Sequence, residues 1–239
     1  MARPYQQWNV LPHGNLSEVD DGILTVVGQI RMPLVSLPRR MTVVRLSDSR
    51  LVLWSAIALD EKGMATVEAF GRPAFLIVPN DHHRLDAKPW KDRYPQLQVV
   101  APEGSRAKVE EIVPVDTTAP HFGDPHVMFV TVPGTRDHEA ALVVHTSNGT
   151  TLVLNDLVGN IRGVSGMEGW LLHLAGFAGN VAQIPRVVKL ALVKDANALR
   201  RELLRWSELD SLRRILVSHG EPIEANPRRT LRDLADSLA

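Results

Sequence analysis

The sequence predicts an α/β protein in which two β-sheets are sandwiched between helices. Short apolar runs separated by turn residues fill the first two thirds of the chain, and longer segments with helical spacing occupy the last third. Short apolar runs are typical of buried strands, whereas apolar residues at helical spacing indicate amphipathic helices. A β-rich region followed by mixed strands and helices is the pattern of a layered α/β fold.

The first half of the chain supplies the first group of elements. Residues 1–21, with several Pro, Gly, Asn and Asp, are expected to form an extended arm on a single domain that spans residues 1–239. Turn residues at Ser47-Asp48-Ser49 predict a hairpin between two of the strands. The predicted strands are 23–27, 41–46, 50–54, 75–78, 97–100 and a short one near Ile112. The predicted helices are 60–70, a short one containing Trp90, and 105–110.

The second half predicts the remaining strands and most of the helices. A turn at Ser147-Asn148-Gly149 joins two neighbouring strands. Pro227 lies just before the last predicted helix, a position that suits proline. The predicted strands are 127–132, 141–145, 151–154 and 215–217. The predicted helices are 166–177, 185–193, 197–209 and 228–238.

Composition excludes several classes of protein. The chain has 239 residues, is 44% hydrophobic, carries no net charge and contains no Cys. The absence of Cys removes disulfides and thiolate chemistry. A zero net charge argues against general nucleic-acid binding. No apolar run approaches the ~20 residues of a membrane span, and the N-terminus lacks the apolar core of a secretory signal. We therefore expect a cytoplasmic protein with no nucleic-acid or membrane partner.

Three polar clusters each follow an apolar run, and they carry the main functional signal. Asn80-Asp81-His82-His83 follows residues 75–78, Asn155-Asp156 follows 151–154, and Ser218-His219 follows 215–217. In layered α/β folds, chemistry gathers where strands end. Imidazole nitrogens and carboxylate oxygens are suitable zinc ligands. The clusters therefore predict a metal site where these strand ends converge.

The order of these clusters resembles the metallo-β-lactamase fold superfamily. That family has a His-x-His-x-Asp-His cluster after a strand, a later Pro-Gly-His segment, an Asp after another strand and a His near the C-terminus. Pro89-Trp90 and Tyr94-Pro95 resemble a divergent branch. The resemblance extends from about Gly22 to Ile223. It implies a four-layer αββα sandwich and a hydrolase that uses a metal-activated water on an ester, amide, thioester or phosphodiester.

The chain departs from the family pattern at the first two motifs. Two alignments of the His cluster are open, because neither restores all four ligands. They place the ligand positions at Asn80, His82, Arg84 and Leu85, or at Asp81, His83, Leu85 and Asp86. Thr135 stands where the Pro-Gly-His segment has its metal-binding His, and His138 lies three residues further on. Asp156 and His219 match directly.

These matches define the candidate residues and their roles. The expected ligands of one zinc, iron or manganese ion are His82 or His83, Asp156 and His219, with His138 as a further candidate. The nearest extra carboxylates, as ligand or general base, are Asp81 and Asp86. Arg84 either opposes metal binding through its charge or binds an anionic substrate bidentately.

Two other interpretations remain open at this stage. The first is a non-catalytic member of the same fold, without metal, whose decayed site serves ligand binding or assembly. Asp156 would then hold a loop by accepting backbone hydrogen bonds, and His219 would bond to Asp156. The second concerns the apolar stretch from Trp170 to Phe177, which either packs in the core or forms a homo-oligomer interface. A small-molecule substrate or ligand is expected in each case.

Overall fold

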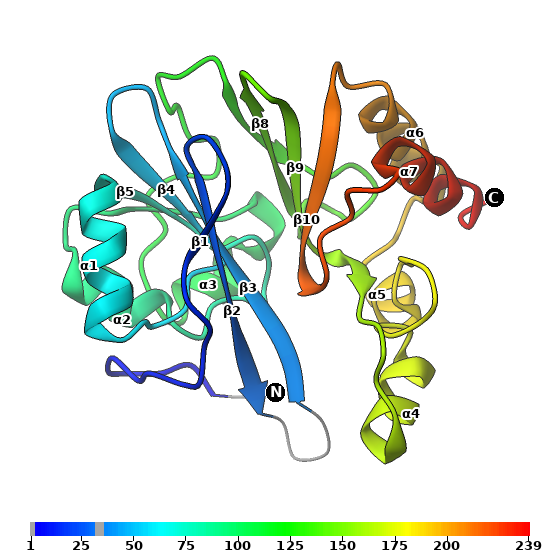
Figure 1. Ribbon diagram of the computed structural model, residues 1–239, viewed down its shortest axis with the longest axis horizontal. Helices are drawn as coiled ribbons and strands as arrows, with labels where there is room; N and C mark the ends of the chain where they lie inside the picture. Colours follow the sequence, from blue (N-terminus) through cyan, green and yellow to red (C-terminus); the bar gives the residue numbers. More distant parts are fainter. Residues whose placement is uncertain (1–2, 32–35) are drawn as a thin grey trace.

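The computed structural model describes residues 3–31 and 36–239, and their strands form two β-sheets (Figure 1). Met1 and Ala2, the start of the predicted arm, lie outside the described residues. The strands of the first sheet, in spatial order, are β1 (Ser17–Asp20), β2 (Ile23–Arg31), β3 (Ser36–Arg45), β4 (Arg50–Trp54), β5 (Arg72–Ile77) and β6 (Gln98–Val100). Strands β1 to β4 are antiparallel, whereas β4, β5 and β6 run parallel.

The second sheet contains the remaining described strands. In spatial order they are β10 (Leu212–Gly220), β9 (Gly149–Asn160), β8 (Ala140–Thr146) and β7 (Val127–Thr131). Strands β7, β8 and β9 are antiparallel, and β10 is parallel to β9. The predicted turn at 147–149 connects β8 to β9 as expected.

Helices cover the outer face of each sheet (Figure 1). The helices beside the first sheet are α1 (Glu61–Phe70), α2 (Ala87–Arg93) and α3 (Arg106–Glu110), the last preceded by the 3-10 turn η1 (Glu103–Ser105). Those that follow β9 are α4 (Gly166–Ala175), α5 (Arg186–Ala191), α6 (Ala196–Ser207) and α7 (Pro227–Asp236). Asp60 caps α1 by accepting a hydrogen bond from Gly63 N at 2.7 Å, as expected at a helix N-terminus.

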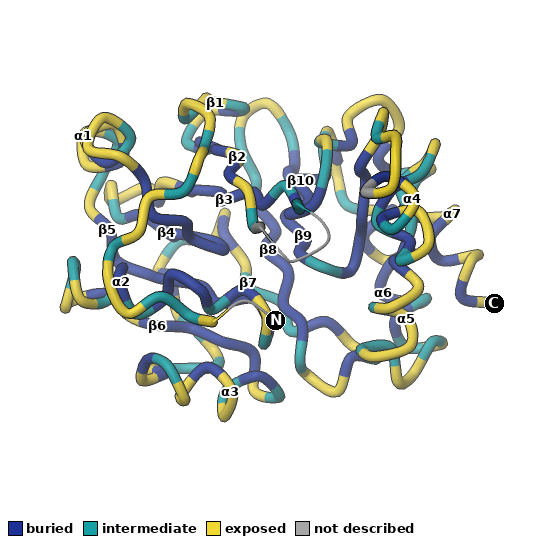
Figure 2. Tube along the Cα trace, turned by 90° about the horizontal axis from the view of Figure 1, so that it is seen from below, coloured by how far each residue is buried: buried dark blue, intermediate teal, exposed yellow. Residues whose placement is uncertain are grey.

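Three hydrophobic cores separate the layers, and alternation along the strands creates them. In β4, Leu51 and Leu53 join the core under α1 and α2, while Val52 and Trp54 face the second sheet. In β9, Val153 faces the first sheet and its neighbours pack beneath α6 and α7. Strands buried on both faces appear in sequence as continuous apolar runs. Figure 2 shows the buried strands between more exposed helices, so the predicted four-layer αββα sandwich is confirmed.

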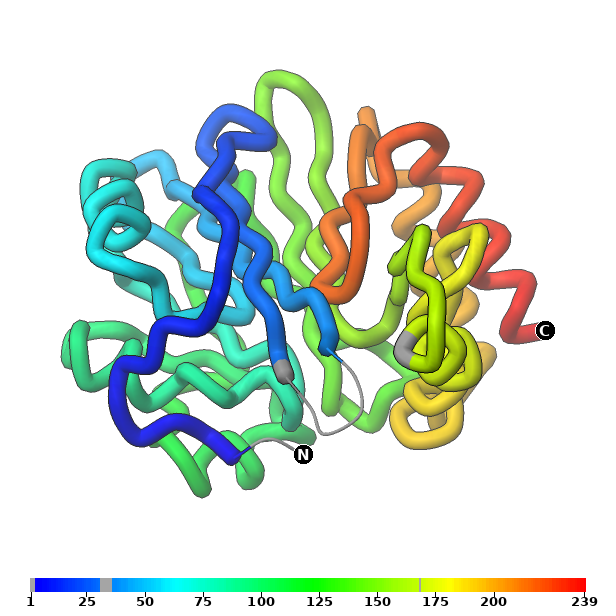
Figure 3. The backbone as a smooth tube through the Cα atoms, turned by 60° about the horizontal axis from the view of Figure 1, so that its bottom comes forward, coloured from blue at the N-terminus to red at the C-terminus, as the bar shows by residue number. Residues whose placement is uncertain are grey.

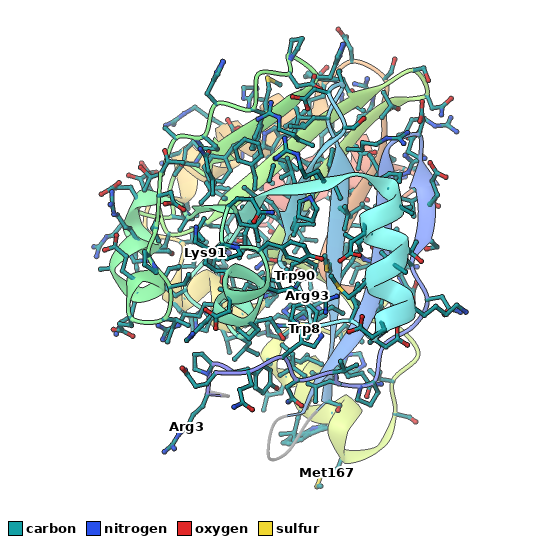
Figure 4. All side chains as sticks on the ribbon, turned by 90° about the vertical axis from the view of Figure 1, so that its left-hand side faces the viewer. Arg3, Trp8, Trp90, Lys91, Arg93 and Met167 are labelled. Carbon is teal, nitrogen blue, oxygen red and sulfur yellow. The ribbon has the colours of Figure 1, made fainter. Side chains whose placement is uncertain are left out.

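The N-terminal arm and the segment near Ile112 differ in part from the prediction. The arm contains a strand, since Ser17–Asp20 pairs with β2, and Trp8 packs at a tilt against Trp90 with ring centroids 5.1 Å apart (Figure 4). The strand expected near Ile112 is absent, because residues 111–113 form a turn after α3. Val113 and Val115 are buried in the first core from this irregular segment, so their apolar character reflects burial without strand pairing.

None of the helices in the described part of the chain has the length and hydrophobicity needed to cross a membrane.

A buried ion pair joins the edge of the first sheet to the second. Arg214 on β10 donates to the Asp20 carboxylate at the end of β1 and, at 3.1 Å, to Thr151 Oγ1 on β9. Asn148 Nδ2 also donates to Asp20 at 2.8 Å. Burial raises the pKa of Asp20, but the hydrogen bonds from Asn148 and Arg214 outweigh it and hold the pKa below the usual 3.8. The ionised carboxylate therefore stabilises the folded state.

Replacing Asp20 by Asn should lower the free energy of unfolding at pH 7 by about 3 kcal/mol, because Arg214 loses its buried partner. The stabilisation from a lowered pKa is present above 3.8 and disappears as the pH falls below it. Urea denaturation at several pH values should therefore show the wild-type and variant curves converging in acid. The control is Asp21→Asn, whose carboxylate is 70% exposed and 3.7 Å from Arg45; equal losses in both variants would contradict the prediction.

Candidate metal centre

His83, Asp156 and His219 converge in a buried site between the two sheets. The Nε2 atoms of His83 and His219 each lie 2.9 Å from the same oxygen, Oδ1 of Asp156. His83 follows β5 of the first sheet, whereas the other two residues lie on β9 and β10 of the second. The exposed fractions of the three side chains are 3%, 13% and 5%. The three residues therefore form a compact, buried cluster, in which water competes little for their hydrogen bonds.

Asn80 determines which of the two adjacent histidines enters the cluster. Its Oδ1 accepts hydrogen bonds from His82 N at 2.9 Å and His83 N at 3.2 Å. This side-chain-to-backbone turn fixes the loop after β5 so that His83 is buried and His82 is exposed. The geometry places His83, rather than His82, beside Asp156.

Asp156 and His219 lie within strands, whereas the sequence predicted them just beyond strand ends. Strand β9 pairs with β10 from Leu154 opposite Val217 to Gly159 opposite His219. Between these pairs β9 has more residues than β10, so it bulges and carries Asp156 into the space between the sheets. A bulge redirects a side chain without ending the sheet, which is why the apolar run stops at Leu154 while the strand continues.

The second ring nitrogen of each histidine is also engaged. His219 Nδ1 lies 2.6 Å from Pro38 O, and His83 Nδ1 lies 2.6 Å from Ser55 Oγ. A carbonyl oxygen only accepts, so Nδ1 of His219 carries a hydrogen. Because Nε2 of the same ring lies 2.9 Å from Oδ1 of Asp156, either a proton on Nε2 or a cation must lie between these two atoms.

This donor set fits a divalent metal ion. One ligand atom from each of the three residues lies within 4.8 Å of the others. Metal-binding histidines usually donate their other ring N–H to a carbonyl, carboxylate or water, and the contact of His219 with Pro38 O matches that pattern. Two imidazoles and one carboxylate are ligands typical of zinc sites that keep an open position.

The charges of His83 and Asp156 are set by burial and by their mutual contact. Burial lowers the pKa of His83, although the nearby Asp156 opposes the shift. Burial alone would raise the pKa of Asp156, but the interactions with His83 and His219 outweigh it and hold the pKa well below its usual value. A carboxylate anion facing a neutral imidazole is the protonation state that metal ligands require.

Glu139 is a buried member of the site that the sequence analysis missed. Asn80 Nδ2 donates at 2.8 Å both to Glu139 Oε2 and to Asp156 Oδ2, and Asp156 N donates to Glu139 Oε1 at 3.2 Å. Burial raises the pKa of Glu139 well above its usual value, and the charge of Asp156 adds to the shift. Burial and the neighbouring anion therefore both favour the protonated form of Glu139. Its only sequence signal is an acid directly before the apolar run at 140–144.

The other predicted ligands lie at the rim. His138 Nδ1 is 3.4 Å from Asp81 Oδ1, and both side chains are partly exposed. His82 is exposed and lines the larger of the two cavities beside Asp156, which are described below. Thr135, which replaces the family's histidine, is buried and donates to Val132 O at 2.7 Å. These residues border the cluster without contacting Asp156.

Asp86 and Arg84 have structural partners that the sequence analysis did not foresee. Asp86, proposed above as a catalytic carboxylate, forms a buried ion pair with Arg39 and accepts a hydrogen bond from Ala58 N at 3.2 Å. It therefore supports the first sheet and does not line the cavity beside Asp156. Arg84, proposed to bind substrate, forms an ion pair at 2.8 Å with Glu111, which lies at the C-terminal end of α3. The Glu111 carboxylate therefore compensates the charge of Arg84.

Cavities open on both sides of Asp156. The larger, about 570 Å³, lies between the site and α5 and has mainly apolar walls, with cationic side chains at its rim. Phe177, Val187, Val188, Leu192, Arg136 and Lys194 are among the residues that line it. A smaller cavity of about 170 Å³ reaches His83 and His219. The larger cavity has the size expected for a small-molecule ligand.

Comparison with solved structures identifies the fold. The chain is similar to the DIM-1 metallo-β-lactamase (TM-score 0.64, 12% identity, 97% of this chain and 100% of that one). It is also similar to FIM-1 from Pseudomonas aeruginosa in its mono-zinc form (0.60, 13%, 98% and 98%) and to a metallo-β-lactamase from Erythrobacter litoralis (0.64, 14%, 93% and 96%). No protein-family model and no curated protein sequence matches the chain. The protein has the metallo-β-lactamase fold.

Replacing Glu139 by Ala should lower the free energy of unfolding by about 3 kcal/mol. The change leaves Asp156 N and one hydrogen of the Asn80 amide without buried acceptors, and each such loss costs about 1–3 kcal/mol. Urea denaturation at pH 7 measures the effect. The control is Glu110→Ala, which removes an exposed pair with Arg106 and should cost under about 0.5 kcal/mol. A loss at Glu139 no larger than the control would show that these hydrogen bonds are dispensable.

Proposed function

We propose that the protein is a metal-dependent hydrolase that holds one divalent ion, zinc, iron or manganese, through His83, Asp156 and His219. The observation that carries the proposal is the convergence of two imidazole Nε2 atoms on one carboxylate oxygen, each at 2.9 Å. The orientation of His219 by Pro38 O supports it, because that contact leaves Nε2 as the ligand atom. Similarity to metallo-β-lactamases, one of them in a mono-zinc form, adds further support.

The surrounding residues have separable tasks in this proposal. When bound, a divalent ion supplies a nucleophilic water near neutral pH and polarises a carbonyl or phosphoryl oxygen. Ser55 and Pro38 O orient the two imidazoles, while Asn80 and Glu139 hold the Asp156 carboxylate. Asp81, partly exposed at the cavity rim beside His138, is the nearest carboxylate able to act as general base.

The larger cavity favours a substrate that combines an apolar part with an anionic group. Its wall beside α5 consists of Val187, Val188 and Leu192, whereas Arg136 and Lys194 stand at its rim. An ester, amide, thioester or phosphodiester of that description fits both surfaces. The alternative is a non-catalytic protein that uses the same cavity for ligand binding, which the missing residues of the His cluster and Thr135 favour.

Metal content separates these two functions. Protein purified without chelator or a His-rich tag should contain about one metal ion per chain, measured by elemental mass spectrometry. His219→Ala and His83→Ala should lose the ion, while His82→Ala, which alters an exposed neighbour, should retain it. Panels of chromogenic esters and phosphodiesters should then show activity only in variants that retain metal. Absence of stoichiometric metal, even after zinc or manganese is added back, would contradict the hydrolase proposal.

Replacing Ser55 by Ala should weaken metal affinity by about tenfold or more, because it removes the hydroxyl that orients His83. Competition with a chromogenic chelator measures the affinity. The matched control is Ser207→Ala on α6, because the buried Ser207 hydroxyl donates to Leu204 O at 2.7 Å and not to any of the three ligands. Equal affinity in both variants would mean that Ser55 does not act through His83.

A further inference from the structure

The exposed apolar side chains of the protein are concentrated in one segment. Nine large hydrophobic residues are exposed in the described part of the chain, and six of them lie between Met167 and Leu190. These six are Met167, Trp170, Leu174, Val181, Val187 and Leu190. Single exposed apolar residues are ordinary on protein surfaces, whereas a cluster of this kind marks an interaction surface. We call α4, α5 and the loop between them the apolar arm.

The apolar arm extends from the body of the molecule. Figures 1 and 3 show α4 and α5 beside the second sheet, with α4 at the lower edge of Figure 1. In Figure 4 the Met167 side chain reaches the lower edge of the molecule. Exposed fractions of 72% for Met167, 62% for Trp170 and 80% for Leu190 are too high for residues that serve the protein's own core.

The apolar arm carries more basic than acidic residues. Its acid is Glu168 in α4, and its bases are Arg186 and Lys189 in α5, both exposed. Beyond Glu168 no Asp or Glu occurs up to Lys194, which is also exposed, although the chain as a whole has equal numbers of acidic and basic residues. Exposed Trp and Leu side chains beside an excess of Lys and Arg are the combination that places a helix at the interface of an anionic bilayer.

We propose that the apolar arm docks the protein peripherally on an anionic lipid surface. Charge complementarity favours lipid over a second copy of the chain, because a two-fold contact would bring together two copies of a surface that has more basic than acidic residues. The sequence-based expectation of no membrane partner rested on the lack of a spanning segment, and the apolar arm does not span the bilayer. Docking of this kind brings the larger cavity, which shares Val187 with the apolar arm, to the lipid surface.

Tryptophan fluorescence offers a specific readout of docking. Trp54, Trp90 and Trp206 are buried at 1% or less and Trp8 is partly buried, so Trp170 alone is strongly exposed. Vesicles of phosphatidylcholine with about 30% phosphatidylserine should shift the emission to the blue. Brominated lipid in these vesicles should quench it. Pure phosphatidylcholine vesicles should bind much more weakly, and added salt should reverse binding to the anionic ones.

Variants test the same surface by vesicle sedimentation. Trp170→Ser combined with Leu190→Ser should weaken binding by about tenfold or more, and Arg186→Glu should weaken binding to anionic vesicles only. Met128→Ser, which alters an exposed apolar residue on β7 (42% exposed), is the matched control. Unchanged thermal melts would confirm that the variants fold. His219→Ala should bind vesicles as the wild type does, since docking is independent of the metal centre.

Three results would overturn the proposal. The first is no vesicle binding by the wild type, and the second is equal binding to neutral and anionic vesicles. The third is a concentration-dependent dimer, seen by analytical ultracentrifugation without vesicle binding and abolished by the Trp170→Ser/Leu190→Ser change, which would assign the apolar arm to a second copy of the chain.

Discussion

The carboxylate of Asp156 is the group on which the interior of this protein depends. Its Oδ1 lies 2.9 Å from a histidine of each sheet, His83 after β5 and His219 on β10. An anion at this depth is costly unless every oxygen has partners. Oδ2 is satisfied by Asn80 at 2.8 Å. The two sheets therefore pack around a fixed polar contact, which constrains how they can slide over each other.

This contact explains why neutral polar residues surround the cluster. Asn80 contributes one amide that binds Asp156, Glu139 and the following loop at once. Burial and the neighbouring anion raise the pKa of Glu139 well above its usual value. A second carboxylate anion beside Asp156 is disfavoured in this low-dielectric environment. Asp156, whose pKa is held well below its usual value by the two histidines, is therefore the carboxylate that the network stabilises as an anion.

The fold was predictable from sequence because strands that are buried on both faces appear in it as short, continuous apolar runs. The residues of runs such as 152–154 and 215–217 alternate between two cores, so every one of them is apolar. The site was only partly predictable. The choice of His83 over His82 depends on a turn held by the Asn80 side chain, and periodicity carries no information about it. Ser55 and Glu139 reach the site from distant parts of the chain, so no local motif identifies them.

Under the proposed function, the replacements at the family's ligand positions favour one ion rather than two. In the alignment that places His83 at the second ligand position, Leu85, which is buried, stands at the position of the family's Asp. The Thr135 hydroxyl donates to Val132 O, and Glu139 accepts hydrogen bonds from Asn80 and from the backbone of Asp156. Both side chains are therefore engaged within the protein. This leaves His83, Asp156 and His219 as the ligand set for the single ion proposed above.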